Sequence, residues 1–148
     1  MTDAPTEAVL QGIVRRESRS LLQYIADAFP WATEEERGVL ATLRQLIDEE
    51  HQAAGDLMRF MTRRRLALPY IGAYPAEFTT INYVSLDHLL PLLADEERRA
   101  VAALEQGLDA LHDPDARARV QEVLDMKRRH LQTLDKLAAA HPEPTPAS

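Results

Sequence analysis

The sequence contains no cysteine, and this absence excludes two kinds of structure. Neither a disulfide framework nor a thiolate metal site can form. The lack of cysteine also agrees with a cytoplasmic location. Glycine is scarce as well, with 5 residues among 148, and the long stretches rich in Ala, Leu, Glu and Arg favour helix over sheet.

Long apolar runs and an excess of basic residues are also missing. No run is long enough to span a bilayer, so we expect no membrane partner. The net charge of -7 argues against nucleic acid as the main partner, because phosphate binding needs a basic face. The one basic run, residues 63–65, falls at a predicted helix end, where cations complement the helix dipole. Gly-rich phosphate loops, nucleophile elbows and HExxH motifs are absent too.

Apolar residues recur at helical spacing over four regions, which predicts an all-α four-helix bundle. The first region covers residues 6–29. Thr33 and Glu36 form a capping-box pattern that predicts the start of the second helix, which ends near residues 64–65. Residues 1–140 therefore form one bundle domain, whereas residues 141–148 carry three prolines and are predicted to be a disordered tail.

The third region, residues 86–108, contains a proline. Pro91 predicts a kink or a restart near Asp95, whose side chain could cap the new helix. Asp113 followed by Pro114 predicts the start of the last helix, with an Asp cap and proline at the first position.

Residues 66–78 form an apolar connection between the second and third helices, with two prolines and three aromatics. We expect this connection to pack along the bundle. Thirteen extended residues reach ~40 Å at about 3.3 Å each, which is nearly the length of a thirty-residue helix. A crossover between parallel helices is therefore allowed, as is a short return. The connection could also form a homodimer surface, although covering its own bundle is the simpler interpretation.

Each helical stripe is interrupted near its centre by a charged residue. Glu17, Glu50, Glu97 and Lys127 take apolar positions on the first, second, third and last helices, and His130 lies one turn beyond Lys127. At ~1.5 Å per residue, Glu17 and Lys127 both come near mid-height, and the other two fall within a turn or two of that level. The four helices therefore direct polar groups towards one zone.

Buried charges persist only when they are paired, hydrogen-bonded or bound to a cation, which leaves several hypotheses. One is a metal site for iron, manganese or zinc, since carboxylates and imidazole suit these ions. A second is a metal-free ion-pair network around Lys127 that fixes the helix register of a scaffold or interaction module. A third is a pocket in which these groups orient a small-molecule ligand.

The pattern resembles the ferritin-like superfamily of four-helix bundles. There, two helices each supply one Glu to a metal centre and the other two each supply Glu-x-x-His. The resemblance implies metal ligation by Glu17, Glu50, Glu97 and His130. It also implies a degenerate site, because Ala53 stands in place of one His and Lys127 in place of one Glu.

Simpler roles exist for some of these residues. Glu97 could be an ordinary first-turn acid after Asp95, and His130 a satisfied side chain beside the stripe. Tyr24 lies on the same helix face as Glu17, and we expect it to pack in the core with its hydroxyl bonded to a carboxylate. An ammonium among carboxylates competes with a divalent ion, so the sequence argues against a working di-iron oxidase. It leaves open one metal ion or none.

Overall fold

The fold is all-helical. The computed structural model describes residues 4–27, 33–81 and 85–142, and these ranges contain five α-helices, two 3-10 helices and no strand. The elements in chain order are α1 (Ala4–Ser18), α2 (Leu21–Asp27), η1 (Glu34–Glu36), α3 (Arg37–Arg63), η2 (Ala76–Ile81), α4 (Leu86–Ala110) and α5 (Pro114–Ala140).

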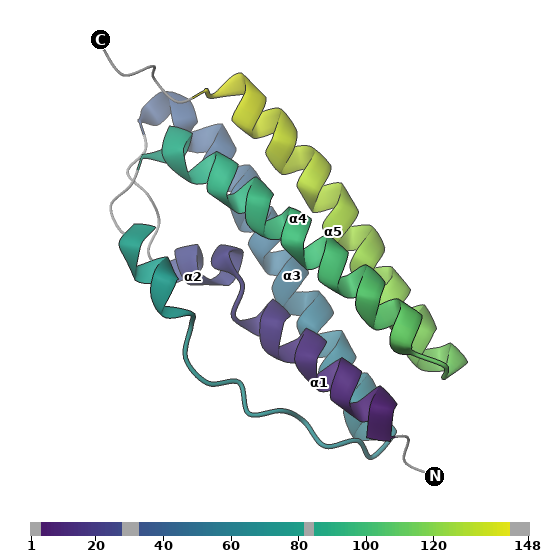
Figure 1. Cartoon of the computed structure of the whole chain (residues 1–148). Coiled ribbons are helices and arrows are strands. Elements are labelled where there is room, and N and C mark those ends of the chain that lie inside the picture. The colour runs from purple at the N-terminus through teal and green to yellow at the C-terminus, as the bar shows by residue number, and fades with distance from the viewer. Residues whose placement is uncertain (1–3, 28–32, 82–84, 143–148) are drawn as a thin grey trace.

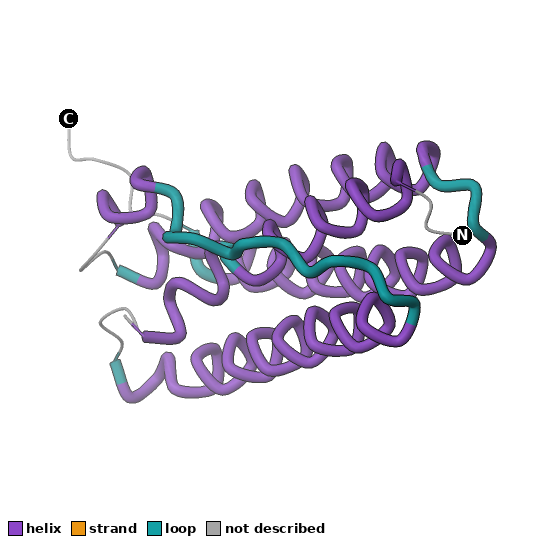
Figure 2. Tube along the Cα trace, turned by 90° about the horizontal axis from the view of Figure 1, so that it is seen from below, coloured by secondary structure: helices purple, strands orange, loops and turns teal. Residues whose placement is uncertain are grey.

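The long helices lie side by side, and one connection runs along them (Figure 1). The α1–α2 segment runs antiparallel to α3, and α5 runs antiparallel to α4. Helices α3 and α4 point the same way, so the chain between them returns along the length of α1 (Figures 1 and 2). The apolar connection predicted from the sequence is therefore the crossover, and not the short return.

Side chains of α1, and of the residue that follows it, hold the crossover through its backbone. The four residues involved are spaced four apart, so they lie along one side of the helix and its end, and we call them the α1 ladder. Glu7 Oε2 accepts from the Ala67 amide (3.0 Å), Gln11 Nε2 donates to the Ala67 carbonyl (2.8 Å), Arg15 Nε donates to the Tyr70 carbonyl (3.1 Å), and Arg19 Nε donates to the Gly72 carbonyl (2.8 Å). Gly72 has φ +73°, a conformation that glycine adopts without strain.

The first predicted helix is two helices in the structure. The chain breaks between Ser18 and Leu21, and the Gln23 amide donates to Ser20 Oγ (3.2 Å), so Ser20 caps α2. The prediction of one continuous helix over residues 6–29 is thus wrong, because apolar spacing alone does not register a two-residue interruption. Residues 28–29 lie outside the described residues.

Pro91 does not interrupt the third helical region. Helix α4 continues from Leu86 to Ala110 with Pro91 inside it, so no helix restarts at Asp95. A proline removes one backbone hydrogen bond. The adjacent Leu90 and Leu93 are buried, and their packing offsets that loss.

The other predicted helix starts are confirmed. Glu36 Oε1 accepts from the Thr33 amide (2.9 Å) and from Thr33 Oγ1 (3.1 Å), at the beginning of η1 and α3. Asp113 Oδ2 accepts from the Ala116 amide (2.9 Å), and Pro114 is the first residue of α5. Of the predicted tail, residues 143–148 lie outside the described residues.

The apolar core is divided in two. One cluster gathers side chains of α2 with the beginnings of α3 and α4 and the end of α5, around Leu22, Leu43 and Leu90. The other gathers α1 with the end of α3 and the first half of α5, around Leu10 and Met61. Within the described residues, no helix is long and apolar enough to cross a membrane.

Candidate polar centre

A buried ammonium lies among three buried glutamates. Lys127 Nζ contacts Glu50 Oε2 and lies 2.6 Å from Glu17 Oε2 and 3.1 Å from Glu97 Oε1. Lys127 and Glu50 have no exposed surface, and Glu17 and Glu97 are each 3% exposed. These four residues, the polar centre, come one each from α1, α3, α4 and α5. The structure thus brings together four of the residues singled out in the sequence.

Ser20 forms a hydrogen bond with the polar centre, and this contact was not predicted from the sequence. Its Oγ donates to Glu50 Oε1, the oxygen that does not contact Lys127. The break between α1 and α2 places Ser20 there. The pattern Ser20-x-x-Gln23 matches the capping-box spacing and was a usable signal for this break.

Burial and mutual charge set the protonation of the polar centre. Burial alone would lower the pKa of Lys127, but the carboxylates of Glu17, Glu50 and Glu97 outweigh it and hold that pKa well above its ordinary value. Burial raises the pKa of Glu17, against the opposing effect of Lys127. Burial also raises the pKa of Glu97 to about 8, although Lys127 opposes the shift. Glu97 is therefore mostly protonated at neutral pH.

Three buried oxygens of the polar centre have no hydrogen-bond partner, namely both oxygens of Glu17 and Oε2 of Glu97. Glu17 Oε2 forms an ion pair with Lys127, so Glu17 Oε1 and Glu97 Oε2 are the two that no donor reaches. Three carboxyl groups share one ammonium, so the centre has more acceptor capacity than Lys127 and Ser20 satisfy. An unpaired buried acceptor costs free energy, which makes these two atoms the places where a further donor would bind.

His130 is buried, but it contacts a different carboxylate. Its Nε2 lies 2.7 Å from Glu49 Oε2, and its Nδ1 is buried without a hydrogen-bond partner. Burial lowers the pKa of His130, against the effect of Glu49, and the imidazole is neutral at pH 7. Sequence spacing could not separate Glu49 from Glu50 as its partner.

Tyr24 lies among aromatic side chains from the crossover. Its ring contacts Tyr74 edge-on, with centroids 5.3 Å apart, and Phe78 at 5.7 Å. Such packing agrees with the core position expected from the sequence, whereas the expected bond from the hydroxyl to a carboxylate stays a prediction. The ring sits with the apolar cluster around Leu22.

A second polar group lies at one end of the bundle. Glu36, Asp87 and His141 place possible ligand atoms within 4.8 Å of one another, and this group could hold a metal ion. All three side chains are half-buried. The sequence places Glu36 in a capping box, Asp87 at a helix start and His141 in the tail. It does not predict this group, because residue spacing does not show that η1, α4 and the end of α5 meet.

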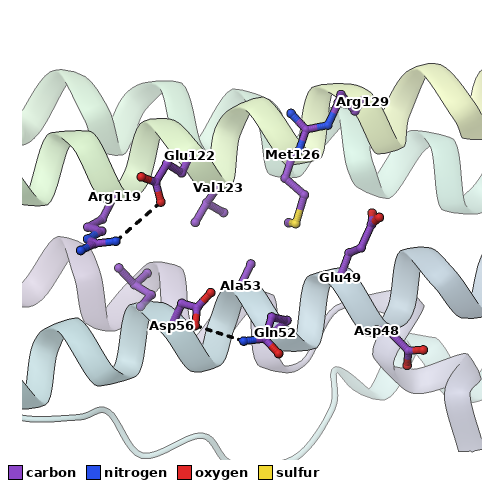
Figure 3. A pocket seen from close by; sticks show the side chains of 11 residues that line it. Asp48, Glu49, Gln52, Ala53, Asp56, Arg119, Glu122, Val123, Met126 and Arg129 are labelled. Carbon is purple, nitrogen blue, oxygen red and sulfur yellow. Dashed lines mark hydrogen bonds and ion pairs between the residues drawn. The ribbon is translucent and has the colours of Figure 1, made fainter.

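A pocket of about 470 Å³ opens between α3 and α5 (Figure 3), and none of the four residues of the polar centre lines it. Ala53, Val123 and Met126 contribute apolar surface, and Asp56 and Arg119 are among its charged residues. Ala53 is the position at which the ferritin-like pattern has a histidine, and it faces open space here.

The polar centre does not fit a metal ion as it stands. The ammonium of Lys127 occupies the point where the three glutamates converge, and it satisfies one oxygen of each. A divalent ion at that point would have to displace a buried cation. The imidazole that the ferritin-like pattern assigns to the site bonds to Glu49 instead. The geometry favours the ion-pair hypothesis over a metal centre.

Comparisons with protein-family models, curated proteins and solved structures find no match for this chain.

Proposed function

We propose that this chain is a four-helix bundle of the ferritin-like type, whose metal centre has been replaced by an ammonium–carboxylate cluster. In this proposal α1 and α2 together form the first helix. The single long crossover between parallel α3 and α4 supports the proposal, since ferritin-like bundles have one such connection. The proposal excludes an oxidase that depends on a metal at this centre.

The observation that carries the proposal is the position of Lys127. A fully buried ammonium contacting three carboxylates supplies the positive charge that a metal ion would otherwise supply. It also ties one residue from each of four helices to a single point. The polar centre then works as a structural core that fixes how the helices align, as buried polar groups do in some bundles.

Metal analysis of untagged protein tests this proposal. We expect less than about a tenth of an equivalent of iron, manganese or zinc at the centre after anaerobic reconstitution, because Lys127 competes for the carboxylates. Metal bound by Glu36, Asp87 and His141 is a separate contribution, which the His141→Ala variant removes. Retention of an equivalent of metal by His141→Ala protein, and its loss in Glu50→Gln protein, would overturn the proposal.

A variant that rebuilds the ligand set sharpens the test. Ala53→His with Lys127→Glu, made in the His141→Ala background, restores both residue types missing from the ferritin-like pattern. We expect this variant to gain stoichiometric metal and to become more stable when metal is added, because metal binding to a folded site adds to folding free energy. No gain would count against the ferritin-like origin of the centre.

An interaction module is a second candidate, supported by two exposed side chains of the crossover. Tyr70 is 86% exposed and Leu68 is 48% exposed, and they are the large exposed apolar residues of the described chain. A homodimer through this surface predicts that Tyr70→Ser shifts the protein towards monomer in light scattering, whereas Arg37→Ser, an exposed change elsewhere, does not. A monomeric wild-type protein would exclude the homodimer.

A further inference from the structure

A second pocket reaches the polar centre from the side of the crossover. It has a volume of about 440 Å³ and lies between α1, α2, α4 and the crossover segment. Glu17, Glu97 and Lys127 line it, although each is 3% exposed or less. The polar centre therefore forms its innermost wall.

The inner wall offers carboxyl oxygens that no donor reaches. Glu17 Oε1 and Glu97 Oε2 have neither a hydrogen bond nor an ion pair with Lys127, and both residues line this pocket. Once Glu97 has lost its proton, above a pH of about 8, three carboxylates face one ammonium, and the wall is complementary to a second positive charge. A primary ammonium fits this position, because its three donors reach separate acceptors.

The side walls and the rim have different chemistry. Apolar side chains from three elements, among them Leu22, Phe78 and Leu93, line the pocket. Four arginines also line it: Arg15, Arg16, Arg19 and Arg99. Arg15, Arg16 and Arg99 are exposed. Glu77 and Glu96 also line the pocket, and Glu96 pairs with Arg99, so arginines outnumber acidic residues at the opening without excluding them. The pocket thus passes from carboxyl oxygens through an apolar section to an opening with an excess of guanidinium groups.

We propose that this pocket binds a small zwitterion, with its ammonium at Glu17 and Glu97, an apolar body, and an anionic group at the arginine rim. The body replaces water on the apolar walls, and the carboxylate or phosphate end pairs with guanidinium groups. The inference rests on the proposed function in one respect: Lys127, and not a metal ion, holds the carboxylates in place.

The orientation distinguishes a zwitterion from simpler ligands. A bare amine lacks the anionic group that pairs with the guanidinium groups at the rim. A carboxylate without an amine would place its apolar end against unsatisfied oxygens. A divalent ion would find two free oxygens beside an ammonium, which is poor coordination.

Calorimetry with matched probes tests the proposal on metal-free full-length protein at pH 8.5. The first probe, 6-aminohexanoate, carries an ammonium group at one end and a carboxylate at the other. Hexylamine carries only the ammonium group, and hexanoate carries only the carboxylate. We expect 6-aminohexanoate to bind at least about tenfold more tightly than either single-ended probe. Equal binding of hexanoate, tighter binding of MnCl₂ by His141→Ala protein, or no binding of 6-aminohexanoate at millimolar concentration would overturn the proposal.

Two variants and a control locate the binding. Glu97→Gln removes the charge at the inner wall, and Arg16→Ala removes a guanidinium at the rim. Each should weaken 6-aminohexanoate binding about tenfold, and the Glu97→Gln effect should be absent for hexanoate. Glu105→Gln, the same change at an exposed position of α4 outside the pocket, should leave the affinity unchanged. Unchanged affinity in both pocket variants would contradict the proposal.

Metal analysis of the same samples separates the two conclusions. Metal-free protein that fails to bind 6-aminohexanoate overturns the zwitterion site alone. Protein that retains metal through Glu50 overturns the proposed function.

Discussion

Replacing Lys127 with methionine is expected to destabilise the protein by roughly 3–5 kcal/mol, the cost of breaking a buried ion pair by removing one partner. Methionine matches the length of the lysine stem, so the change removes charge and leaves most of the packing. Glu17, Glu50 and Glu97 would then face one another in a buried space without a cation. Urea denaturation measures the loss directly.

Two comparisons show whether the loss comes from charge. Lys136 is the other lysine of the sequence and is exposed, so Lys136→Met should have little effect. Adding Glu17→Gln and Glu97→Gln to Lys127→Met should recover much of the stability, since neutral side chains tolerate burial better than carboxylates. A Lys127→Met protein as stable as wild type would mean that the ammonium does not hold the polar centre together.

Arginine should not replace Lys127 well. The three carboxylates approach one nitrogen atom from different helices, and a compact ammonium meets that geometry. The planar fork of a guanidinium is larger and directs its donors within one plane. The sequence contains many arginines but only two lysines, so the use of lysine at this position is consistent with the geometry.

The stability of the wild-type protein should fall as the pH rises from about 6.5 to 8. The pKa of Glu97 is about 8 in the folded protein against an ordinary value of 4.5, so between these values the folded state holds a proton that the unfolded chain has released. Stability therefore declines with increasing pH, by up to roughly 1.4 kcal/mol per pH unit from this group. The raised pKa of Glu17 acts in the same direction. The lowered pKa of His130 acts in the opposite direction, but only below about pH 6.5, where the unfolded chain protonates its imidazole and the folded protein does not.

The Glu97→Gln variant isolates this contribution. Glutamine cannot ionise, so the variant should be less sensitive to pH and should gain stability relative to wild type as the pH approaches 8. The raised pKa of Lys127 affects stability only above pH 10.5, outside this window. Glu105→Gln provides the matched exposed control. If the stability of wild type and of Glu97→Gln changed in parallel between pH 5 and 9, the raised pKa of Glu97 would be contradicted.

Helical periodicity was enough to predict the polar centre, because one residue in each stripe departs from an otherwise apolar series. Glu17, Glu50, Glu97 and Lys127 could be placed at similar depth from a rise of ~1.5 Å per residue. Periodicity does not fix the rotation of a helix finely. Glu49 and Glu50 are neighbours in the sequence, and only the packed structure shows that His130 contacts Glu49 whereas Lys127 contacts Glu50.

Interactions between elements distant in the sequence were beyond prediction. The group of Glu36, Asp87 and His141 depends on where three helix ends meet, which spacing within one segment does not encode. The length of the connection allowed both a crossover between parallel helices and a short return, so the sequence did not fix the relative direction of α3 and α4. The restart considered near Pro91 was wrong for a related reason, since tertiary burial of α4 outweighs a local preference, whereas the alternative of a kink there stays a prediction.

The α1 ladder has a consequence for mutational tolerance and for the divergence of related chains. Its four side chains bond to amide and carbonyl groups, so most side chains of residues 67–72 are not needed to hold the crossover in place. The exception is Ile71, which packs against the apolar cluster around Leu10. Substitutions elsewhere in this segment should be tolerated, apart from proline at 67 and non-glycine residues at 72. Homologues would then share the four-residue spacing of Glu7, Gln11, Arg15 and Arg19 while their crossovers differ in sequence.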